Sequence, residues 1–180
     1  MASKLRVDHI EPVNGVPTGG GGGIIQVTSN TYTATDNNEV GAATWWRTNA
    51  SCSITPHSST SKILVFGHVS TSVVGPQYNI GTGIYRGTST LISDALGDAA
   101  SNRGRVHTAT EMNTSADAMV TVSLNYLDSP ATTSAVTYYV GIRNPSSATR
   151  FCYINRGVTD TDSTYYPRGT TTLTLFEISA

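Results

Sequence analysis

The last strand expected from the sequence has apolar side chains on both faces, and this constrains the fold more than any other feature. Residues 170–178 read TTTLTLFEI. Because side chains alternate across a strand, Leu173 and Leu175 point one way and Phe176 and Ile178 the other. One set can fill the core of a sandwich, but the other needs a cover. The sequence suggests no helix for this, so the simplest cover is another copy of the chain.

Two further segments share this two-faced character, residues 24–27 and residues 63–69. In the second, Ile63, Val65 and Val69 lie on one face, whereas Leu64 and Phe66 lie on the other. Together with the C-terminal strand, these segments predict an inner sheet that is covered on both sides.

Two segments alternate between apolar and polar residues instead, residues 119–126 cleanly and residues 136–142 nearly so. The residues expected to face the core are Val120, Val122, Leu124 and Tyr126 in the first, and Val136, Tyr138, Val140 and Ile142 in the second. This pattern is typical of a sheet that is wet on one face. We therefore predict that these two segments belong to a separate outer sheet.

The composition agrees with an all-β protein. Charged residues make up 13% of the 180 residues, well below the usual share of roughly 25%. Short runs of Val, Ile, Leu, Tyr and Trp recur between turn residues, as in a sandwich or barrel. One wet and one dry sheet favour an antiparallel β-sandwich around a symmetry axis. The predicted strands span residues 24–28, 40–46, 51–54, 63–69, 78–85, 119–126, 136–142, 151–154 and 172–178, with at most one helical turn in residues 92–100.

The first 23 residues form a separate piece. Leu5 and Val7 alternate with charged residues, as in a short strand, and prolines then punctuate the segment. Five glycines at residues 19–23 predict a flexible joint, or a place where backbones pack too closely for a Cβ. We therefore divide the chain into an N-terminal segment, residues 1–23, and a β-sandwich domain, residues 24–180.

Charge and hydropathy exclude several partners. The formal net charge is −1 with no basic patch, so we expect no binding to nucleic acid. No apolar run approaches the roughly 18 residues of a membrane span, and residues 1–23 lack the apolar core of a signal peptide. We therefore expect synthesis and folding in a cytoplasm, where Cys52 and Cys152 remain reduced and buried.

No residue pattern indicates catalysis, a metal site or a cofactor. The glycine run is not followed by the Gly-Lys-Ser/Thr of a phosphate loop. A calcium loop starting at Asp160 fails because Tyr165 stands where glycine is needed. Asp94 and Asp98 lack the surroundings of a glycosidase pair. The histidines are scattered, without a second ligand at helical spacing: His9, His57, His68 and His107.

Two aromatic pairs are candidate surface contacts, Trp45 with Trp46 and Tyr165 with Tyr166. Adjacent side chains on a strand face opposite ways, so one of each pair is expected outside the core. The outer ring could stack on a sugar or contact a partner. We favour packing between subunits, because aromatic residues are enriched at such interfaces.

Several segments resemble small virion structural proteins of tailed bacteriophages, especially marine ones, which are often described as tail-fibre-like. The resemblance lies in SKLRVDHIEP at residues 3–12, the glycine run, GIIQV at 23–27, the Thr55-Pro56 pair, SKILV at 61–65, GIYR at 83–86 and LTLFEI at 173–178. Such proteins resemble the trimeric jelly rolls of the C1q and tumour-necrosis-factor type.

The resemblance implies a homotrimeric jelly roll in which the two-faced strands line the threefold axis. Leu173, Leu175, Phe176 and Ile178 are then the candidate interface residues. It also implies a virion component, made in the bacterial host cytoplasm, whose N-terminal segment docks onto other tail or capsid proteins. Leu5, Val7 and Ile10 are the candidate attachment residues, and the sandwich would face outward for contact with host-surface glycan.

Two alternatives remain open. A capsid decoration protein or head fibre would need only a docking surface, whereas a host-binding tail fibre would need an exposed patch. A free carbohydrate-binding module belongs to a different class, and it would not need the appendage that precedes the glycines.

Overall fold

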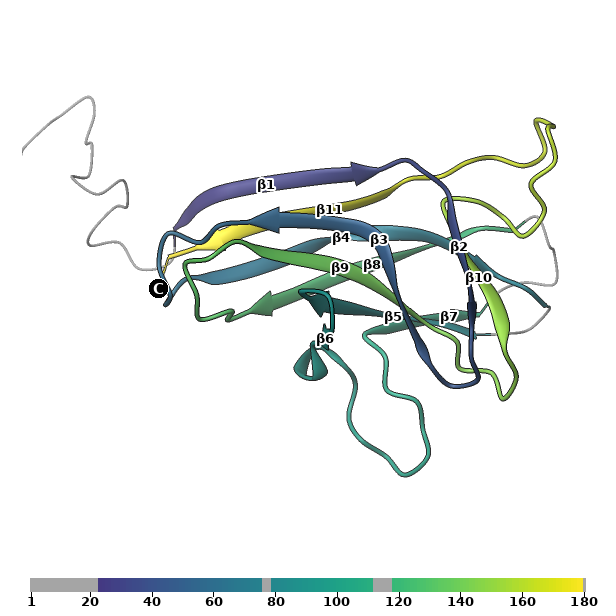
Figure 1. Ribbon diagram of the computed structural model, residues 1–180, viewed down its shortest axis with the longest axis horizontal. Helices are drawn as coiled ribbons and strands as arrows, with labels where there is room; N and C mark the ends of the chain where they lie inside the picture. Colours follow the sequence, from purple (N-terminus) through teal and green to yellow (C-terminus); the bar gives the residue numbers. More distant parts are fainter. Residues whose placement is uncertain (1–22, 76–78, 112–117, 180) are drawn as a thin grey trace, which may run out of the picture.

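The computed structural model describes residues 23–75, 79–111 and 118–179. Within them the chain forms eleven strands and one short 3₁₀ turn, η1 (Ser93–Ala95) (Figure 1). The strands are β1 (Ile24–Tyr32), β2 (Asp36–Val40), β3 (Trp45–Ile54), β4 (Lys62–Val73), β5 (Asn79–Arg86), β6 (Thr90–Leu91), β7 (Thr108–Glu111), β8 (Val120–Asp128), β9 (Val136–Arg143), β10 (Arg150–Ile154) and β11 (Thr171–Ile178).

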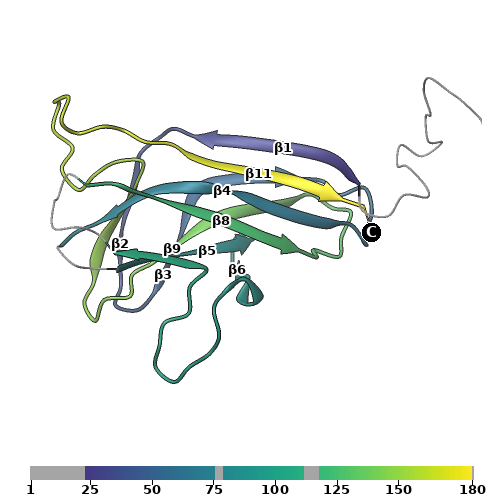
Figure 2. The ribbon, with the colours of Figure 1, turned by 180° about the vertical axis from the view of Figure 1, so that it is seen from behind.

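The strands form two antiparallel sheets packed face to face. The first, which we call sheet A, runs β1-β11-β4-β10-β2, with β8 paired to the other edge of β4. The second, sheet B, runs β3-β9-β5-β6, and β7 also pairs with β5. Figures 1 and 2 show the two layers from opposite sides. The predicted all-β antiparallel sandwich is therefore confirmed.

The strand order is that of a jelly roll. When β2, β6 and β10 are left aside, eight strands remain, and we number them one to eight in chain order. Sheet A then has the order one-eight-three-six, which is β1-β11-β4-β8. Sheet B has the order two-seven-four-five, which is β3-β9-β5-β7. This is the order obtained when one long antiparallel hairpin is rolled up, which is how a jelly roll closes two sheets over one core.

Alternate residues of the long strands meet between the sheets. Ile63 and Val65 of β4, Leu124 of β8, Leu175 of β11 and Ile142 of β9 belong to one core cluster, and all five side chains are fully buried. Val136, Tyr138, Val140 and Ile142 of β9 all point inward, as the alternation predicted. Cys52 and Cys152 are both buried and unpaired, as expected.

The predicted grouping of β1, β11 and β4 in one sheet is confirmed, because these strands are consecutive neighbours. The cover on the second face of this sheet stays a prediction. The assignment of residues 119–126 to a separate outer sheet is wrong, since β8 pairs with β4 along Ile63–Thr71. Clean alternation shows only that one face of a strand is wet. It does not say which of two sheets contains that strand.

Residues 40–46 do not form the predicted continuous strand. β2 ends at Val40 and β3 begins at Trp45, with a turn in which Thr44 Oγ1 donates to Gly41 O (2.9 Å). Ala43 takes a positive φ of 55° there. The segment predicted separately at 51–54 is the second half of β3, which continues beyond an irregularity between Arg47 and Ser51.

Both ends of the described chain lie at one end of the sandwich (Figure 1). The Ser179 backbone N–H donates to Gly23 O (3.0 Å), which ties the start of β1 to the end of β11. The loop between β10 and β11 lies at the opposite end. None of the described residues belongs to a helix long and apolar enough to span a membrane.

Candidate functional site: the outer face of sheet A

An apolar row crosses four neighbouring strands on the outer face of sheet A. The register places Val27 of β1 beside Phe176 of β11, Phe176 beside Leu64 of β4, and Leu64 beside Leu127 of β8. We call these four residues the apolar row. Val27 is 53% exposed and Leu127 44% exposed, although both are large apolar side chains.

Further apolar residues flank the row. Phe66, two residues along β4 from Leu64, is 53% exposed. On the other side of the row, Ile24 pairs with Ile178, and Ile24 is 60% exposed. The outer face of sheet A therefore carries seven apolar side chains near the end of the sandwich where the chain termini lie.

On β1 and β11, the other half of this face is polar. Ser29 and Thr174 share a hydrogen bond between their hydroxyls (2.9 Å), and Thr31 and Thr172 share another (3.1 Å). These pairs sit beside one another across β1 and β11. Because the hydroxyls satisfy each other, this half of the face can remain in water at little cost.

The structure separates the four candidate interface residues into two pairs. Leu173 is 2% exposed and Leu175 is fully buried in the core of their own chain. This burial removes both from the candidate interface, because the opposite sheet already covers them. Phe176 and Ile178 lie on the outer face, half-buried, and remain available to a neighbour.

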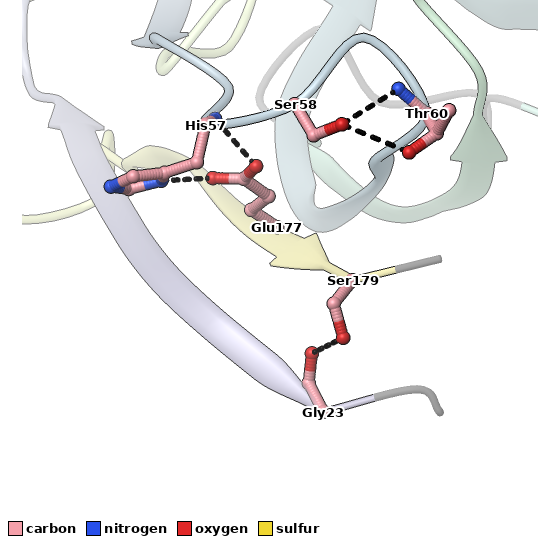
Figure 3. A network of polar contacts seen from close by, with 6 residues as sticks. All are labelled: Gly23, His57, Ser58, Thr60, Glu177 and Ser179. Atoms are coloured by element: carbon pink, nitrogen blue, oxygen red, sulfur yellow. Dashed lines mark hydrogen bonds and ion pairs between the residues drawn. The ribbon is translucent and has the colours of Figure 1, made fainter. Parts of the chain in front are cut away.

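A buried carboxylate anchors the loop beside this end of the sheet (Figure 3). Glu177 is fully buried, since it shares the inward side of β11 with Leu175. Its Oε1 accepts the His57 backbone N–H (2.7 Å), and its Oε2 lies 2.8 Å from His57 Nδ1. When the amide nitrogen of Gln26 is turned toward Glu177, it also donates a hydrogen bond to Glu177 Oε2 (3.1 Å).

These contacts determine the ionisation of the carboxyl. Burial would raise the pKa of Glu177, but the hydrogen bond from the His57 side chain lowers it, as does the one from the His57 backbone. The net result is a pKa below the ordinary glutamate value. The ionised carboxylate therefore stabilises the junction of β1, β11 and the loop that carries His57.

The aromatic pairs have different surroundings. The Trp46 side chain packs against the core. The Trp45 ring lies over Gly83 of β5, on the outer face of sheet B, where an added Cβ would collide with it. Tyr166 is half-buried, and Tyr165 is 79% exposed in the loop at the end remote from the termini. The two tryptophans therefore lie on opposite faces of sheet B, as expected for neighbours on a strand. The two tyrosines lie in a loop and not on a strand, so the alternation does not apply to them.

Leu5, Val7 and Ile10 lie outside the described residues. No group of three or more His, Cys, Asp or Glu side chains in the described part of the chain is arranged to hold a metal ion.

Sequence reasoning missed Leu127 as part of the apolar surface. It lies one residue beyond the predicted strand 119–126, and it continues the outward series of Thr121, Ser123 and Asn125. Extending the alternation by one residue would have identified it.

No protein-family model matches the chain, and no curated protein sequence matches it. Among solved structures, the chain is similar to one described as the structure of infectious bursal disease virus, Gx strain, with 12% identity and a TM-score of 0.40. The match covers 86% of this chain and 41% of the viral one, so this chain spans less than half of that neighbour's length. The fold assignment rests on the strand order above.

Proposed function

We propose that this protein is a structural component of a bacteriophage virion, a tail-fibre-like homotrimer attached by its N-terminal segment. The observation that carries the proposal is the apolar outer face of sheet A. Contiguous apolar patches of this kind are rare on soluble monomers and mark interaction surfaces. The sequence resemblance to virion proteins supplies the biological setting.

A second copy of the same chain is the occupant that fits this face best. The part of the face formed by β1, β11, β4 and β8 carries little charge, since Lys62 and His68 are the only titratable residues that these four strands place on it. A partner that docks by charge complementarity therefore has little to recognise. Fully burying one such apolar side chain stabilises by roughly 1.5–3 kcal/mol, and a symmetric assembly gains this for each subunit.

The position of the face supports attachment through the N-terminus. The apolar residues lie at the end of the sandwich where β1 begins, and Gly23 is held there by Ser179. Copies that meet through this face would bring their N-terminal segments together at one end. The exposed Tyr165 loop would then lie at the opposite end, facing away from the attachment point.

Threefold closure is proposed in place of a dimer because of the resemblance to trimeric jelly rolls. Light scattering on the purified chain should give three times its 19.0 kDa mass. Phe66→Asp should dissociate the trimer, because it puts a charge on the apolar face. Asn38→Asp, on the exposed strand β2, is the matched control and should leave the trimer intact. A monomeric wild-type protein, or a trimer that survives Phe66→Asp, would refute the assembly.

The virion role has its own test. Deleting residues 1–23 should leave a folded sandwich that no longer incorporates into particles, because the proposed docking residues are gone. Normal occupancy of the truncated chain on particles would contradict the docking role. Imaging of particles labelled on this protein would distinguish a tail fibre from a capsid decoration protein or head fibre.

We also propose that the protein has no catalytic activity. Incubation of the purified protein with host envelope polysaccharide should release no reducing ends. Release that persists through further purification would contradict this.

A further inference from the structure

A polar hollow of about 270 Å³ opens between the β6–η1 segment and the end of β8. Its walls include Arg86 of β5, Asp94 of η1, and Tyr126 and Asp128 of β8. Pockets for drug-sized ligands usually measure about 300–1,000 Å³, so this volume suits one small ring. The hollow is distinct from the Tyr165 loop and from both tryptophans.

One wall of the hollow is held rigidly from behind. Asp128 is 4% exposed. It accepts two hydrogen bonds from Arg86 Nη1 (3.2 and 3.1 Å) and one from the Tyr138 hydroxyl (2.7 Å). Burial and the neighbouring Asp128 raise the pKa of Tyr138, so this phenol keeps its proton and remains a donor. The guanidinium is therefore fixed in place before any ligand arrives.

Several polar groups remain available on the open side. The hydrogen bonds that Arg86 makes within the described residues all come from Nη1, which leaves Nε and Nη2. The Tyr126 hydroxyl has no hydrogen-bond partner among the described residues. Its pKa is raised by burial and then by the charges of Asp94 and Asp128, so it is a donor at neutral pH. Among the described residues, the exposed Asp94 carboxylate accepts a hydrogen bond only from the adjacent Ser93 hydroxyl (3.2 Å).

We propose that this hollow is a subsite for one ring of a neutral saccharide. A sugar ring presents adjacent hydroxyls, which a carboxylate and a guanidinium can each bind with two parallel hydrogen bonds. The Tyr126 ring and Leu91 supply an apolar wall for the C–H face of the sugar.

The charge balance selects the kind of sugar. Asp94 and Asp128 contribute two negative charges and Arg86 one positive charge, so the hollow carries a net charge of −1. Uronic and sialic acids would bring another carboxylate into this field, which is unfavourable. The structure therefore favours hexoses and N-acetylhexosamines.

This inference gives the proposed contact with host-surface glycan a ligand class, and it rests on the proposed function only for the source of the sugar. It places that contact on the flank of the sandwich toward the chain termini, where Asp128 pairs with Ile63, and not at the Tyr165 loop. Leu127 both lines the hollow and ends the apolar row, so the hollow opens beside the proposed subunit interface. The test should accordingly use the full chain in its native assembly.

Saturation-transfer NMR with the methyl glycosides of glucose, galactose, mannose and N-acetylglucosamine tests the subsite, with methyl glucuronide as the acidic probe. At least one neutral glycoside should bind, in the millimolar range expected for a single ring. Asp94→Asn and Tyr126→Phe should each weaken binding by about tenfold, as expected for the loss of a hydrogen bond to a charged or buried group. Asp98→Asn is the matched control, because Asp98 is an exposed carboxylate of the same loop that does not line the hollow.

Binding by no neutral glycoside, preference for the acidic probe, or equal losses in Asp94→Asn and Asp98→Asn would overturn the proposal. Purified lipopolysaccharide and purified capsular polysaccharide, tested as separate arms, would distinguish the two bacterial sources of such sugars. Light scattering on the same samples reports the assembly independently, so a failure of sugar binding cannot be mistaken for a failure of the trimer.

Discussion

Replacing Glu177 by glutamine tests whether the buried carboxylate stabilises the end of the sandwich where the chain termini lie. The substitution preserves size and one acceptor oxygen for the His57 backbone N–H, but it removes the charge that strengthens both bonds from His57. A hydrogen bond to a charged group contributes about 1.5–3 kcal/mol. With one such bond weakened to a neutral one and the other lost, we expect a cost of roughly 2 kcal/mol.

Thermal unfolding followed by circular dichroism should detect this cost. In a domain of this size, 1 kcal/mol shifts Tm by about 2–4 °C, so Glu177→Gln should lower Tm by roughly 4–8 °C. Glu39→Gln is the matched control, because Glu39 is an exposed glutamate on β2, and it should leave Tm nearly unchanged. All samples need the same protein concentration, since the stability of an oligomer depends on it.

The pH dependence of unfolding gives a second readout. The pKa of Glu177 lies below its ordinary value in the folded protein, so folding favours the ionised form. The stability from this group is therefore complete above the unfolded glutamate pKa of about 4.3, and it is lost as pH falls through the lower folded pKa. The Tm difference between wild type and Glu177→Gln should shrink over this acid range. Equal Tm values at neutral pH, or a difference that does not change with acid, would refute the reasoning.

Two further predictions concern the core and the loops remote from the termini. Asn155→Ala should lower the free energy of unfolding by at least about 3 kcal/mol. The reason is that the fully buried Asn155 amide donates to Tyr32 O (2.7 Å) and Ala34 O (2.9 Å) and accepts from the Thr171 hydroxyl (2.8 Å). Chemical denaturation measures this free energy, and a loss below about 1 kcal/mol would contradict the prediction. Cys52 and Cys152 should both resist a thiol reagent in the folded protein and react once the protein is unfolded. Both thiols are buried, and burial raises the pKa of Cys152 to about 12. Fast labelling of the folded protein would show that the core is more open than the structure indicates.

The alternation of side chains predicted the fold class and the two-faced strands because it is a local property of each strand. Phe176 and Ile178 follow from Leu173 and Leu175 by simple counting. Sheet membership is a global property, and this is why β8 was assigned to the wrong sheet although its inward residues were identified correctly. The turn that follows Val40 escaped prediction because small residues at 41–43 continue an apolar run while the backbone reverses.

The polar clusters could not be predicted in the same way. Glu177 lies between two apolar residues in a strand, and the sequence does not show that His57, 120 positions away, reaches it. The Arg86–Asp128–Tyr138 cluster likewise joins three strands that the sequence separates. Its members come together only because the fold packs the end of β8 in sheet A against β5 and β9 in sheet B.

The division of the outer face of sheet A into an apolar and a polar half bears on how copies would meet. On β1, β11, β4 and β8, the apolar side chains of this face lie in the half near the chain termini, where the row from Val27 to Leu127 and its flanking residues are found. In the other half, the serine and threonine hydroxyls of β1 and β11 already bond to each other, so covering them with a neighbour would gain little. We therefore expect subunits to be held tightly where their N-terminal segments converge and more loosely toward the Tyr165 loops. A trimer of this shape would leave those loops free to contact a surface while its base stays attached.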